Sequence, residues 1–547
     1  MELERLYVNG QWIETSKKAP TLDPSTGQAF GEVYVATEAE VDQALASATQ
    51  AAQSWRWSSF RERRALLERV RTVLYDQRDV LATLIAKEQG KPITEALAVE
   101  VIPSIDFLDY FIREGERVLK AQAVRAWQLL FRDKEGWIFY EPLGVVAVIS
   151  PWNYPFSIPF LDIIAALFAG NTVVFKPSPV TPKVGLFIAH LFEMAEIPDG
   201  LLHVLVGGAQ VGQFLVTDPR VRGVLFTGSV ATGQRILELA APALKTSLLE
   251  LGGKDPAIVL EDADLDRAVP GIAWGALMNT GQTCASIERV YVHRARYLEF
   301  VERLTAFVDT LKVGDPREPE TDLGPLTLDA QRNHVHRQVE AARAAGAQVV
   351  RGGTIPDRPG FFYPPTILLD VQQEWDLMQV ETFGPVIPIL PFDHEEEAIA
   401  LANDSRYGLT ASIWTRDRKR AWDLAQRLEA GTVTINDHVF SFGEPHAPWG
   451  GTKSSGLGRS HGKYHLLDLV ELKYVSLDFQ KRKTQFWWFP YDETYRNMLD
   501  LAFPAFFSRS IRARWLALLG FLRYFGRLRK SVSLWNLAKN LRRLLLD

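Results

Sequence analysis

The sequence predicts an α/β protein that contains a doubly wound parallel sheet and a second α/β domain. At 547 residues and 61.6 kDa, the chain is too long for one hydrophobic core. Its composition, 47% hydrophobic and 23% charged, is typical of a globular protein. From about residue 137 onward, strand-like and helix-like segments alternate at the spacing of βαβ units, which favours parallel strands with helices on both faces.

The N-terminal region divides into a strand-rich part and a helical part. Residues 5–35 alternate short apolar runs with turn residues, as in LYVNGQWIE and DPSTGQ, and this pattern predicts short strands. Residues 38–118 are rich in Ala, Leu, Glu and Arg, and their apolar positions recur every three or four residues. That period predicts a series of helices.

The central region carries the alternation on which the fold prediction depends. β-Branched and aromatic residues in WIFYEPLGVVAVISP (137–151) predict strands. The order continues with helix 157–169, strand 171–177, helix 181–195, strands 202–207 and 221–229, and a helix from about residue 231. After 248–260 the alternation resumes, with helices around 264–282 and 296–311 and strands near 289, 348 and 386. We interpret this second series as the second α/β domain.

The number of cysteines and the length of the apolar runs indicate in which cellular compartment the protein is expected. The chain has one cysteine, which excludes an internal disulfide and gives no sign of an oxidising compartment. The first residues, MELERLYVNGQW, lack the basic and apolar regions of a signal peptide. No run approaches the roughly 18 apolar residues that span a bilayer. We expect a cytoplasmic protein, with membrane association left open by the C-terminal tail.

Two short segments are candidates for chemistry, although each has an ordinary reading as well. The lone Cys284, in NTGQTCASIERVYV, could simply be a small buried apolar residue. VLFTGSVATGQRIL places small residues at a strand-to-helix turn, where free N–H groups can bind phosphate. Its glycine spacing is looser than G-x-G-x-x-G, so an unspecialised turn would fit equally well.

Seven motifs, taken together, remove that ambiguity. They are SPWNYPF (150–156), FKPS (175–178), FTGSxxTG (226–233), LELGGK (249–254), GQTC (281–284), ETFGPV (381–386) and PWGGTKSSGLGR (448–459). In order and spacing, the chain from about residue 5 to 480 resembles the NAD(P)-dependent aldehyde dehydrogenase superfamily. The resemblance implies a Rossmann-like cofactor domain (1–122 and 143–255), an α/β catalytic domain (256–474) and a small bridging β element (123–142 and 475–485). Because this element extends a neighbour's sheet in the family, we expect a homodimer or homotetramer.

The resemblance assigns three catalytic roles. Cys284 is the nucleophile, because a thiolate that adds to an aldehyde creates the C–H bond from which a hydride can leave. Asn153 and the backbone N–H of Cys284 are the oxyanion donors. Glu250 activates water for hydrolysis of the thioester, and its presence favours a free acid over a coenzyme A thioester as product. Glu471 matches a second glutamate that relays protons in some members, although a surface role fits it as well.

The same resemblance supplies the cofactor residues. Those expected at the dinucleotide are Trp152, Lys176, Ser178, Gly228, Ser229, Thr232, Gly233, Glu381 and Phe383, and no metal is expected. Lys176 would bind the adenosine ribose, and Glu381 the nicotinamide ribose. Many members that prefer NAD have a glutamate three residues after this lysine, which repels a 2′-phosphate; this chain has Pro179 there. We therefore expect NAD to be used and NADP to be tolerated.

The substrate is expected to be an apolar or aromatic aldehyde, with broad tolerance. The loop that borders the aldehyde channel in the family reads NDHVFSFGEPHAPWGG here, with His438, Phe440, Phe442 and Trp449 and no Lys or Arg to hold a carboxylate. Internal packing of these aromatic residues is the other reading. The rival functions are a specialised semialdehyde dehydrogenase and a non-enzymatic structural protein with the same fold.

The C-terminal region, 486–547, is expected to form a basic amphipathic tail. Residues 509–547 carry ten Arg and Lys against one acidic residue, a net charge of +9, which leaves −14 on the rest of a chain whose total is −5. After Pro504 two helical patterns place apolar residues on one side (Trp515, Leu518, Leu522, Phe525 and Val532; then Leu534, Leu537, Leu541 and Leu544) and Arg509, Arg512, Arg523, Arg527 and Lys530 opposite. The tail could dock on the acidic body or lie on an anionic membrane. No nucleic acid partner is expected.

Overall fold

The computed structural model describes the chain except for residues 1–3, 127–130, 132–133, 480–484, 486–487 and 523–547. The chain forms two compact units. The larger comprises Met1–Leu119 and Pro142–Glu471, and the smaller comprises Lys120–Glu141 and Leu472–Asp547.

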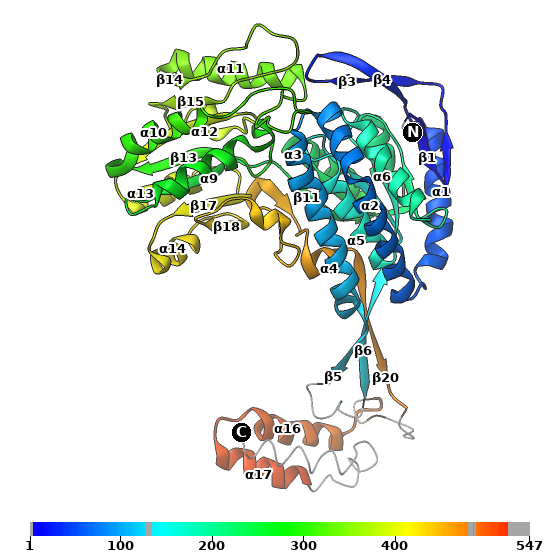
Figure 1. Cartoon of the computed structure of the whole chain (residues 1–547). Helices are drawn as coiled ribbons and strands as arrows, with labels where there is room; N and C mark the ends of the chain where they lie inside the picture. Colours follow the sequence, from blue (N-terminus) through cyan, green and yellow to red (C-terminus); the bar gives the residue numbers. More distant parts are fainter. Residues whose placement is uncertain (1–3, 127–130, 132–133, 480–484, 486–487, 523–547) are drawn as a thin grey trace. The chain divides into compact units, whose positions relative to one another are not determined.

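An eight-stranded sheet forms one half of the larger unit (Figure 1). Its order is β19 (Gly456–Leu457), β11 (Thr246–Glu250), β10 (Val221–Thr227), β7 (Val145–Ile149), β8 (Thr172–Lys176), β9 (Leu202–Val204), β1 (Leu6–Val8) and β2 (Gln11–Ile13). The five strands from β11 to β9 are parallel, and β19, β1 and β2 add antiparallel edges. This is the doubly wound sheet that the alternation predicts.

Helices cover both faces of this sheet. α5 (Ser157–Ala169) and α6 (Pro182–Met194) pack on one face and are themselves covered by α2 (Phe60–Gln89) and α4 (Ile102–Leu119). α1 (Glu38–Trp55), α7 (Ala209–Thr217) and α8 (Val230–Ala240) pack along the other face, and η3 (Ala241–Ala243) follows α8. Between α2 and α4 lie α3 (Ile93–Glu95) and the π-helix η1 (Ala96–Val101). α7 is the one helix of this set for which we saw no signal in the sequence.

Local signals explain where α2 begins and ends. The Ser59 hydroxyl accepts from the backbone N–H of Glu62, and the Glu62 carboxylate accepts from the backbone N–H of Ser59 at 2.7 Å. This reciprocal pair satisfies two donors that a helix start leaves free. Gly90 follows the last turn with φ of 89°, a conformation in which glycine lacks the usual steric penalty.

A seven-stranded sheet forms the other half of the larger unit. Its order is β14 (Gln348–Arg351), β15 (Thr366–Leu369), β16 (Val386–Phe392), β13 (Ile287–His293), β12 (Asp255–Val259), β17 (Thr410–Trp414) and β18 (Thr432–Ile435). All neighbours are parallel except β14 and β15. The strands expected near residues 289, 348 and 386 are present as β13, β14 and β16.

Each face of this sheet has its own hydrophobic core. Ile258 and Tyr291 point into a core shared with α11 (Asp329–Ala345), α13 (Glu395–Asn403) and α14 (Arg418–Ala425). Their sequence neighbours Val259 and Val290 point into a second core, shared with α9 (Leu265–Leu277) and α10 (Arg294–Val308). Such alternation means that both faces of the sheet are buried.

The remaining elements of the larger unit are short. They are the antiparallel pair β3 (Lys18–Asp23) and β4 (Gln28–Tyr34), the helices α12 (Asp376–Gln379) and α15 (Gly462–Asp468), and the 3₁₀ turns η4 (Met278–Gly281), η5 (Phe440–Gly443) and η6 (Lys453–Ser455). The helix expected over 264–282 is therefore shorter than predicted. It ends at Leu277, because Asn279 and Thr280 adopt left-handed backbone angles.

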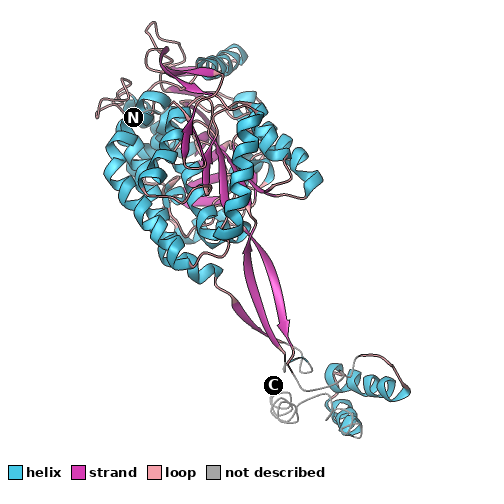
Figure 2. Ribbon diagram, turned by 90° about the vertical axis from the view of Figure 1, so that its right-hand side faces the viewer, coloured by secondary structure: helices cyan, strands magenta, loops and turns pink. Residues whose placement is uncertain are grey.

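The smaller unit contains a three-stranded sheet and a pair of helices (Figure 2). β6 (Glu135–Pro142) lies between β20 (Val470–Leu477) and β5 (Gln122–Arg125). Strands thus occur in both segments predicted to form the bridging element, although β20 begins before residue 475. The division of the whole chain into the predicted domains remains a prediction.

Two helices follow in the C-terminal region, α16 (Glu493–Phe507) and α17 (Ile511–Leu522). α16 has no counterpart in the sequence prediction, which began the helical tail only after Pro504; that proline lies inside α16. The two helices pack through small residues. Gly520 of α17 lies against Leu501 of α16, and two alanines, Ala505 and Ala517, are buried. The predicted apolar residues from 525 to 544, and the basic residues from 523 to 530, lie outside the described residues.

In the part of the chain that the structure describes, no helix combines enough length with enough apolar character to cross a bilayer.

Candidate active site

Cys284 lies on the turn between η4 and β13, where the backbone makes an unusual bend. Asn279, Thr280 and Gly281 all have positive φ. The Gln282 side chain ties the bend together, because its amide nitrogen donates to the carbonyl of Asn279 at 2.9 Å and its oxygen accepts from the backbone N–H of Thr327 at 2.9 Å. Cys284 itself is a free, half-buried thiol.

Two glycines are required because other backbone passes very close to this turn. A Cβ atom on Gly281 would lie 2.2 Å from the carbonyl oxygen of Gly384. One on Gly253 would lie 2.3 Å from the carbonyl oxygen of Cys284. The second contact brings LELGGK against GQTC, which explains why the two motifs meet across a gap of some thirty residues in the sequence.

Asn153 lies on the loop that follows β7 and reaches the same turn. Its side-chain nitrogen donates to the carbonyl of Gln282 at 2.9 Å, and its own carbonyl accepts from the Asn279 side chain at 2.9 Å. An amide nitrogen carries two hydrogens, so one remains for a further acceptor. The structure therefore brings Asn153 beside the backbone of the predicted nucleophile.

A buried carboxylate holds the loop that carries Asn153. Glu100, on η1, accepts from the backbone N–H groups of Phe156 and Ser157 at 2.9 and 3.0 Å, at the start of α5. It also pairs with Lys91, and both side chains are fully buried. Burial lowers the pKa of Lys91, while the attraction of Glu100 opposes that change. These bonds hold the loop in place at the residues that follow Asn153.

Glu250 ends β11 at the carboxyl edge of the eight-stranded sheet. Its side chain is buried, and one carboxylate oxygen accepts from the Ser460 hydroxyl at 3.3 Å. The other oxygen has no hydrogen-bond partner among the described residues. Burial raises the pKa of Glu250 to about 8; the charge of Asp162 adds to this effect and the bond from Ser460 opposes it. A group with this pKa can accept a proton near neutral pH.

Burial and the influence of three acidic groups both disfavour ionisation of the Cys284 thiol. Burial is the largest cause that raises its pKa, followed by the charges of Glu381, Asp255 and Glu250. The protein alone therefore keeps the thiol protonated, and Glu250 and Glu381 lie near enough to influence its ionisation.

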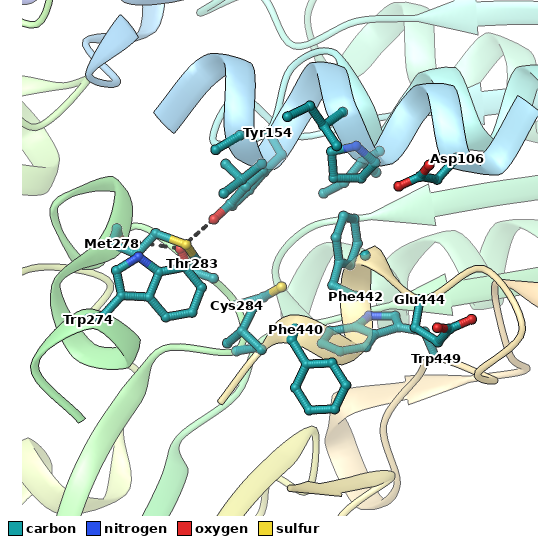
Figure 3. A pocket seen from close by; sticks show the side chains of 18 residues that line it. Asp106, Tyr154, Trp274, Met278, Thr283, Cys284, Phe440, Phe442, Glu444 and Trp449 are labelled. Carbon is teal, nitrogen blue, oxygen red and sulfur yellow. Dashed lines mark hydrogen bonds between the residues drawn. The ribbon is translucent and has the colours of Figure 1, made fainter. Parts of the chain in front are cut away.

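A cavity of about 430 Å³ opens onto Cys284 (Figure 3). Its wall is formed by Ala98, Val99, Ile102, Pro103, Asp106, Tyr154, Ile158, Trp274, Met278, Thr283, Cys284, Ala285, Val439, Phe440, Phe442, Gly443, Glu444 and Trp449. Most of these side chains are apolar, and none is Lys or Arg. A cavity of this size and character suits a small apolar ligand.

The loop predicted to border the channel is only partly in this wall. Phe440, Phe442 and Trp449 line the cavity, as expected. His438 is fully buried and is not among the lining residues; its Nε2 lies 2.7 Å from the carbonyl oxygen of Ala285. Burial lowers the pKa of His438 to about 4, so the ring is neutral and fixes the backbone next to Cys284.

The opposite wall was not predicted. It comes from η1, α4 and α9, with residues such as Val99, Ile102, Asp106 and Trp274. The sequence shows these elements as ordinary amphipathic helices, since one lining residue every three or four positions is also the pattern of core packing. Only the fold could show that these side chains face Cys284.

Lys176 lies at the carboxyl end of β8, level with Ile149 of β7. Its side chain is buried, and its ammonium donates to the carbonyls of Pro177 and Gly207 at 3.0 and 3.2 Å. Burial lowers its pKa to about 8. The third hydrogen of the ammonium group is available for a ribose hydroxyl or a phosphate. Ser178, two residues further along the chain, is also buried, and its hydroxyl accepts from the backbone N–H of Val180 at 3.3 Å.

The glycine-rich turn after β10 leads into α8. Ser229 begins the helix and accepts from the backbone N–H of Thr232 at 3.4 Å. Gly228 donates to the carbonyl of Glu250 at 3.0 Å, and a Cβ on Gly233 would lie 2.6 Å from Leu251. The exposed first turn of this helix has the free N–H groups and positive potential that suit a pyrophosphate. The predicted residues thus fit a dinucleotide.

Glu381, Phe383 and Trp152 lie together at the junction of the two sheets. The Glu381 carboxylate accepts from the backbone N–H of Gly253 at 3.1 Å, next to the turn of Cys284. Burial raises its pKa to about 8. The rings of Phe383 and Trp152 pack edge to face, with 5.4 Å between their centroids. The expected nicotinamide end of the cofactor site is therefore contiguous with the thiol.

Comparison with known proteins agrees with this geometry. The model of the aldehyde dehydrogenase family matches residues 12–475. The chain belongs to the aldehyde dehydrogenase family.

Similar proteins of this family act on different aldehydes. A 4,4′-diapolycopene aldehyde oxidase from a Methylomonas species is 38% identical over 486 residues, which are 88% of this chain and 91% of that protein. The mitochondrial succinate-semialdehyde dehydrogenase of Arabidopsis thaliana is 37% identical over 478 residues, 87% of this chain and 89% of that one. The NAD⁺ complex of an aldehyde dehydrogenase from Bacillus cereus matches with a TM-score of 0.84 at 35% identity, covering 87% and 97% of the two chains.

The family prediction and the fold class are therefore confirmed, and the chain is an aldehyde-oxidising enzyme of a family that uses NAD(P). The non-enzymatic alternative finds no support among these relatives. Among the described residues, no group of three or more His, Cys, Asp and Glu side chains is arranged to hold a metal ion.

Glu471 does not join the other predicted site residues in this aldehyde dehydrogenase. It is exposed on β20, where it accepts from Arg222 at 3.1 Å. Ser460, which the sequence reasoning passed over, is the side chain that contacts Glu250. The position of Glu471 agrees with the surface role that the sequence left open.

Glu288 of β13 supports the cofactor side of the site. Its carboxylate accepts from Lys254 at 2.6 Å and from the backbone N–H groups of Thr382 and Phe383 at 2.7 and 2.8 Å, all in the interior. We expect Glu288→Ala to lower the free energy of unfolding by about 3–5 kcal/mol, because it leaves the buried Lys254 ammonium without the carboxylate that forms its ion pair. Chemical denaturation measures this loss. Glu302→Ala, at an exposed position on α10, is the matched control and should change stability by less than about 0.5 kcal/mol. Equal stability of the two variants would contradict the assignment.

Proposed function

We propose that this enzyme oxidises neutral apolar aldehydes, aliphatic or aromatic and over a broad range, to carboxylic acids with NAD(P)⁺. The observation that carries the proposal is the cavity beside Cys284. Its wall is almost entirely apolar and aromatic and has no cationic side chain to hold a carboxylated substrate. The similarity to an oxidase of a long apolar aldehyde supports the same substrate class.

The first half of the reaction takes place at Cys284. The sulfur adds to the aldehyde carbon to form a thiohemiacetal, and the thiol proton passes to Glu250, which has one carboxylate oxygen free of hydrogen bonds. The second hydrogen of the Asn153 amide and the backbone N–H of Cys284 stabilise the oxyanion. NAD(P)⁺, which Lys176 and the first turn of α8 would hold, would supply the acceptor for the hydride that leaves the former aldehyde carbon. The product on the protein is a thioester of Cys284.

The second half regenerates the thiol. After Glu250 has released the thiol proton to solvent, it removes a proton from the water molecule that attacks the thioester carbonyl. The tetrahedral intermediate collapses, the carbon–sulfur bond breaks, Glu250 returns its proton to the sulfur, and the carboxylic acid leaves. Ser460 holds the Glu250 carboxylate in place through its hydroxyl. The raised pKa of Glu250 suits this exchange of protons.

For the cofactor, we propose that NAD is used and NADP is tolerated. The support is Pro179, which stands where a repelling carboxylate would otherwise lie near a 2′-phosphate, together with the buried ammonium of Lys176. Comparing kcat/KM for the two cofactors tests this. A preference for NAD above roughly a thousandfold, about 4 kcal/mol, would contradict it.

An aldehyde panel tests the substrate proposal. We expect hexanal and benzaldehyde to give higher kcat/KM than acetaldehyde or succinate semialdehyde, because each buried methylene contributes about 0.8 kcal/mol. Cofactor reduction, followed by absorbance, is the readout. The second candidate, a specialised semialdehyde dehydrogenase, is favoured if succinate semialdehyde is the best substrate, as the name of the Arabidopsis relative would suggest.

Assembly and membrane contact are further proposals for the smaller unit. Exposed apolar residues on β6 and β20, including Trp137, Leu472 and Tyr474, support a homodimer or homotetramer. Phe503, Phe507 and Trp515 are exposed on α16 and α17, and Arg512 and Arg514 are exposed on α17, which supports peripheral contact with anionic lipid. Liposome co-sedimentation of the full chain and of a variant with these three aromatics changed to serine tests the membrane contact; equal behaviour favours docking on the protein. A cytoplasmic location stays a proposal, supported by the single cysteine.

A further inference from the structure

The mouth of the cavity carries two acidic side chains. Most of the wall near Cys284 is buried, including Tyr154, Met278 and Trp449. The exposed lining residues, which mark the opening, are Ala98, Ile102, Asp106, Trp274, Phe440 and Glu444. In Figure 3, Asp106 from α4 and Glu444 from the loop after η5 lie on the same side of the cavity.

The negative charges of these two carboxylates repel each other, and no cationic side chain among the described residues forms an ion pair with either of them. Asp106 has no hydrogen bond or ion pair among the described residues, whereas its neighbour Asp109 pairs with Arg71 and with Arg113 at 3.8 Å. Desolvation raises the pKa of Asp106, and the charges of Asp109 and Glu444 add to this effect. The Glu444 carboxylate accepts a hydrogen bond from the backbone N–H of His446, at 3.0 Å, and has no ion pair among the described residues. The opening therefore has a net negative charge.

We infer that Asp106 and Glu444 are specificity-determining residues that repel aldehydes with a carboxylate at the far end. An aldehyde carbon must reach Cys284, so the other end of a chain of several carbons lies toward the opening. There a carboxylate meets two like charges and no cation, whereas a methyl group meets Ile102, Trp274 and Phe440. This inference rests on the proposed function and explains how the enzyme selects neutral substrates from the aldehydes that relatives oxidise.

Hexanal and 6-oxohexanoate form a matched pair of substrates, because they have the same chain length and differ in a terminal carboxylate. We expect Asp106→Asn combined with Glu444→Gln to raise kcat/KM for 6-oxohexanoate about threefold to tenfold, as removal of two partly exposed like charges permits. The value for hexanal should change by less than about twofold. Glutamine can still accept from His446, so the loop is conserved. Glu302→Gln, which removes an exposed charge outside the cavity, is the control and should leave both values unchanged.

Two further readouts separate repulsion from a general structural effect. Repulsion at the opening acts on productive binding, so the gain should appear mainly in KM, with kcat conserved. At about pH 8, where imidazoles are neutral, added salt should also narrow the wild-type preference for hexanal, because exposed charges are screened. An unchanged ratio of the two substrates in the double variant overturns the inference. A wild-type enzyme that does not oxidise hexanal overturns the proposed function instead.

Discussion

Replacing Cys284 by serine is expected to lower kcat by roughly 10⁴-fold or more, since the nucleophile takes part in both chemical steps. A serine hydroxyl is far less acidic than a thiol, and the site already disfavours ionisation: burial and the charges of Glu381, Asp255 and Glu250 raise the pKa of the group at this position. The substitution is nearly isosteric, so the fold and the cofactor site should remain. The rate of cofactor reduction with hexanal measures the effect.

The control for this variant is cofactor binding. The predicted dinucleotide residues Lys176 and Ser229 lie on other elements, so quenching of tryptophan fluorescence by NAD should be the same in the variant and the wild type. Loss of both binding and turnover would point to misfolding. Turnover conserved in the serine variant would mean that Cys284 is not the nucleophile.

Glu250→Gln should have the second largest effect, and of a different kind. Loss of a general base costs about 10²- to 10⁴-fold in kcat. Glutamine can still accept the hydrogen bond from Ser460. If the main task of Glu250 is to activate water, the variant should form one equivalent of reduced cofactor quickly and then stall as the thioester. Because the chain has one cysteine, mass spectrometry should find the acyl group only on the peptide that contains Cys284.

The pH profile tests the same assignment. The pKa of Glu250 is raised to about 8 by burial, so the carboxyl group is largely protonated below that pH and cannot act as a base. The wild-type kcat should therefore rise from about pH 6 to about pH 9 and level off as Glu250 loses its proton. The glutamine variant should lack this rise. A wild-type profile that is flat over the range would contradict the role of Glu250.

The residues to which the motifs assign chemical roles lie close to glycines with strict steric demands. Gly253 and Gly281 have to be glycine, since neighbouring carbonyls leave no room for a Cβ, and each stands within a few residues of a predicted catalytic side chain. The order of strands from β7 to β11 was also readable, because a fully buried parallel strand shows as an apolar run.

The parts that could not be predicted depend on contacts between distant segments. β19 pairs with β11 across some two hundred residues, and Glu100 holds the start of α5 from another helix. Asp106 looks like any polar residue on the outer side of a helix, and only the fold shows that it borders the cavity. Such residues follow the periodicity of ordinary packing, so their function leaves no separate trace in a single sequence.

The burial of the Cys284 thiol has a consequence for the resting enzyme. Peroxides and other electrophiles attack the thiolate far faster than the thiol, and a protein with one cysteine cannot form an internal disulfide to protect an oxidised sulfur. Burial, with a smaller contribution from nearby carboxyl groups, disfavours the thiolate and so protects an atom whose oxidative damage no second sulfur in the chain could reverse. The same buried surroundings that slow the nucleophile at rest thus lengthen its lifetime.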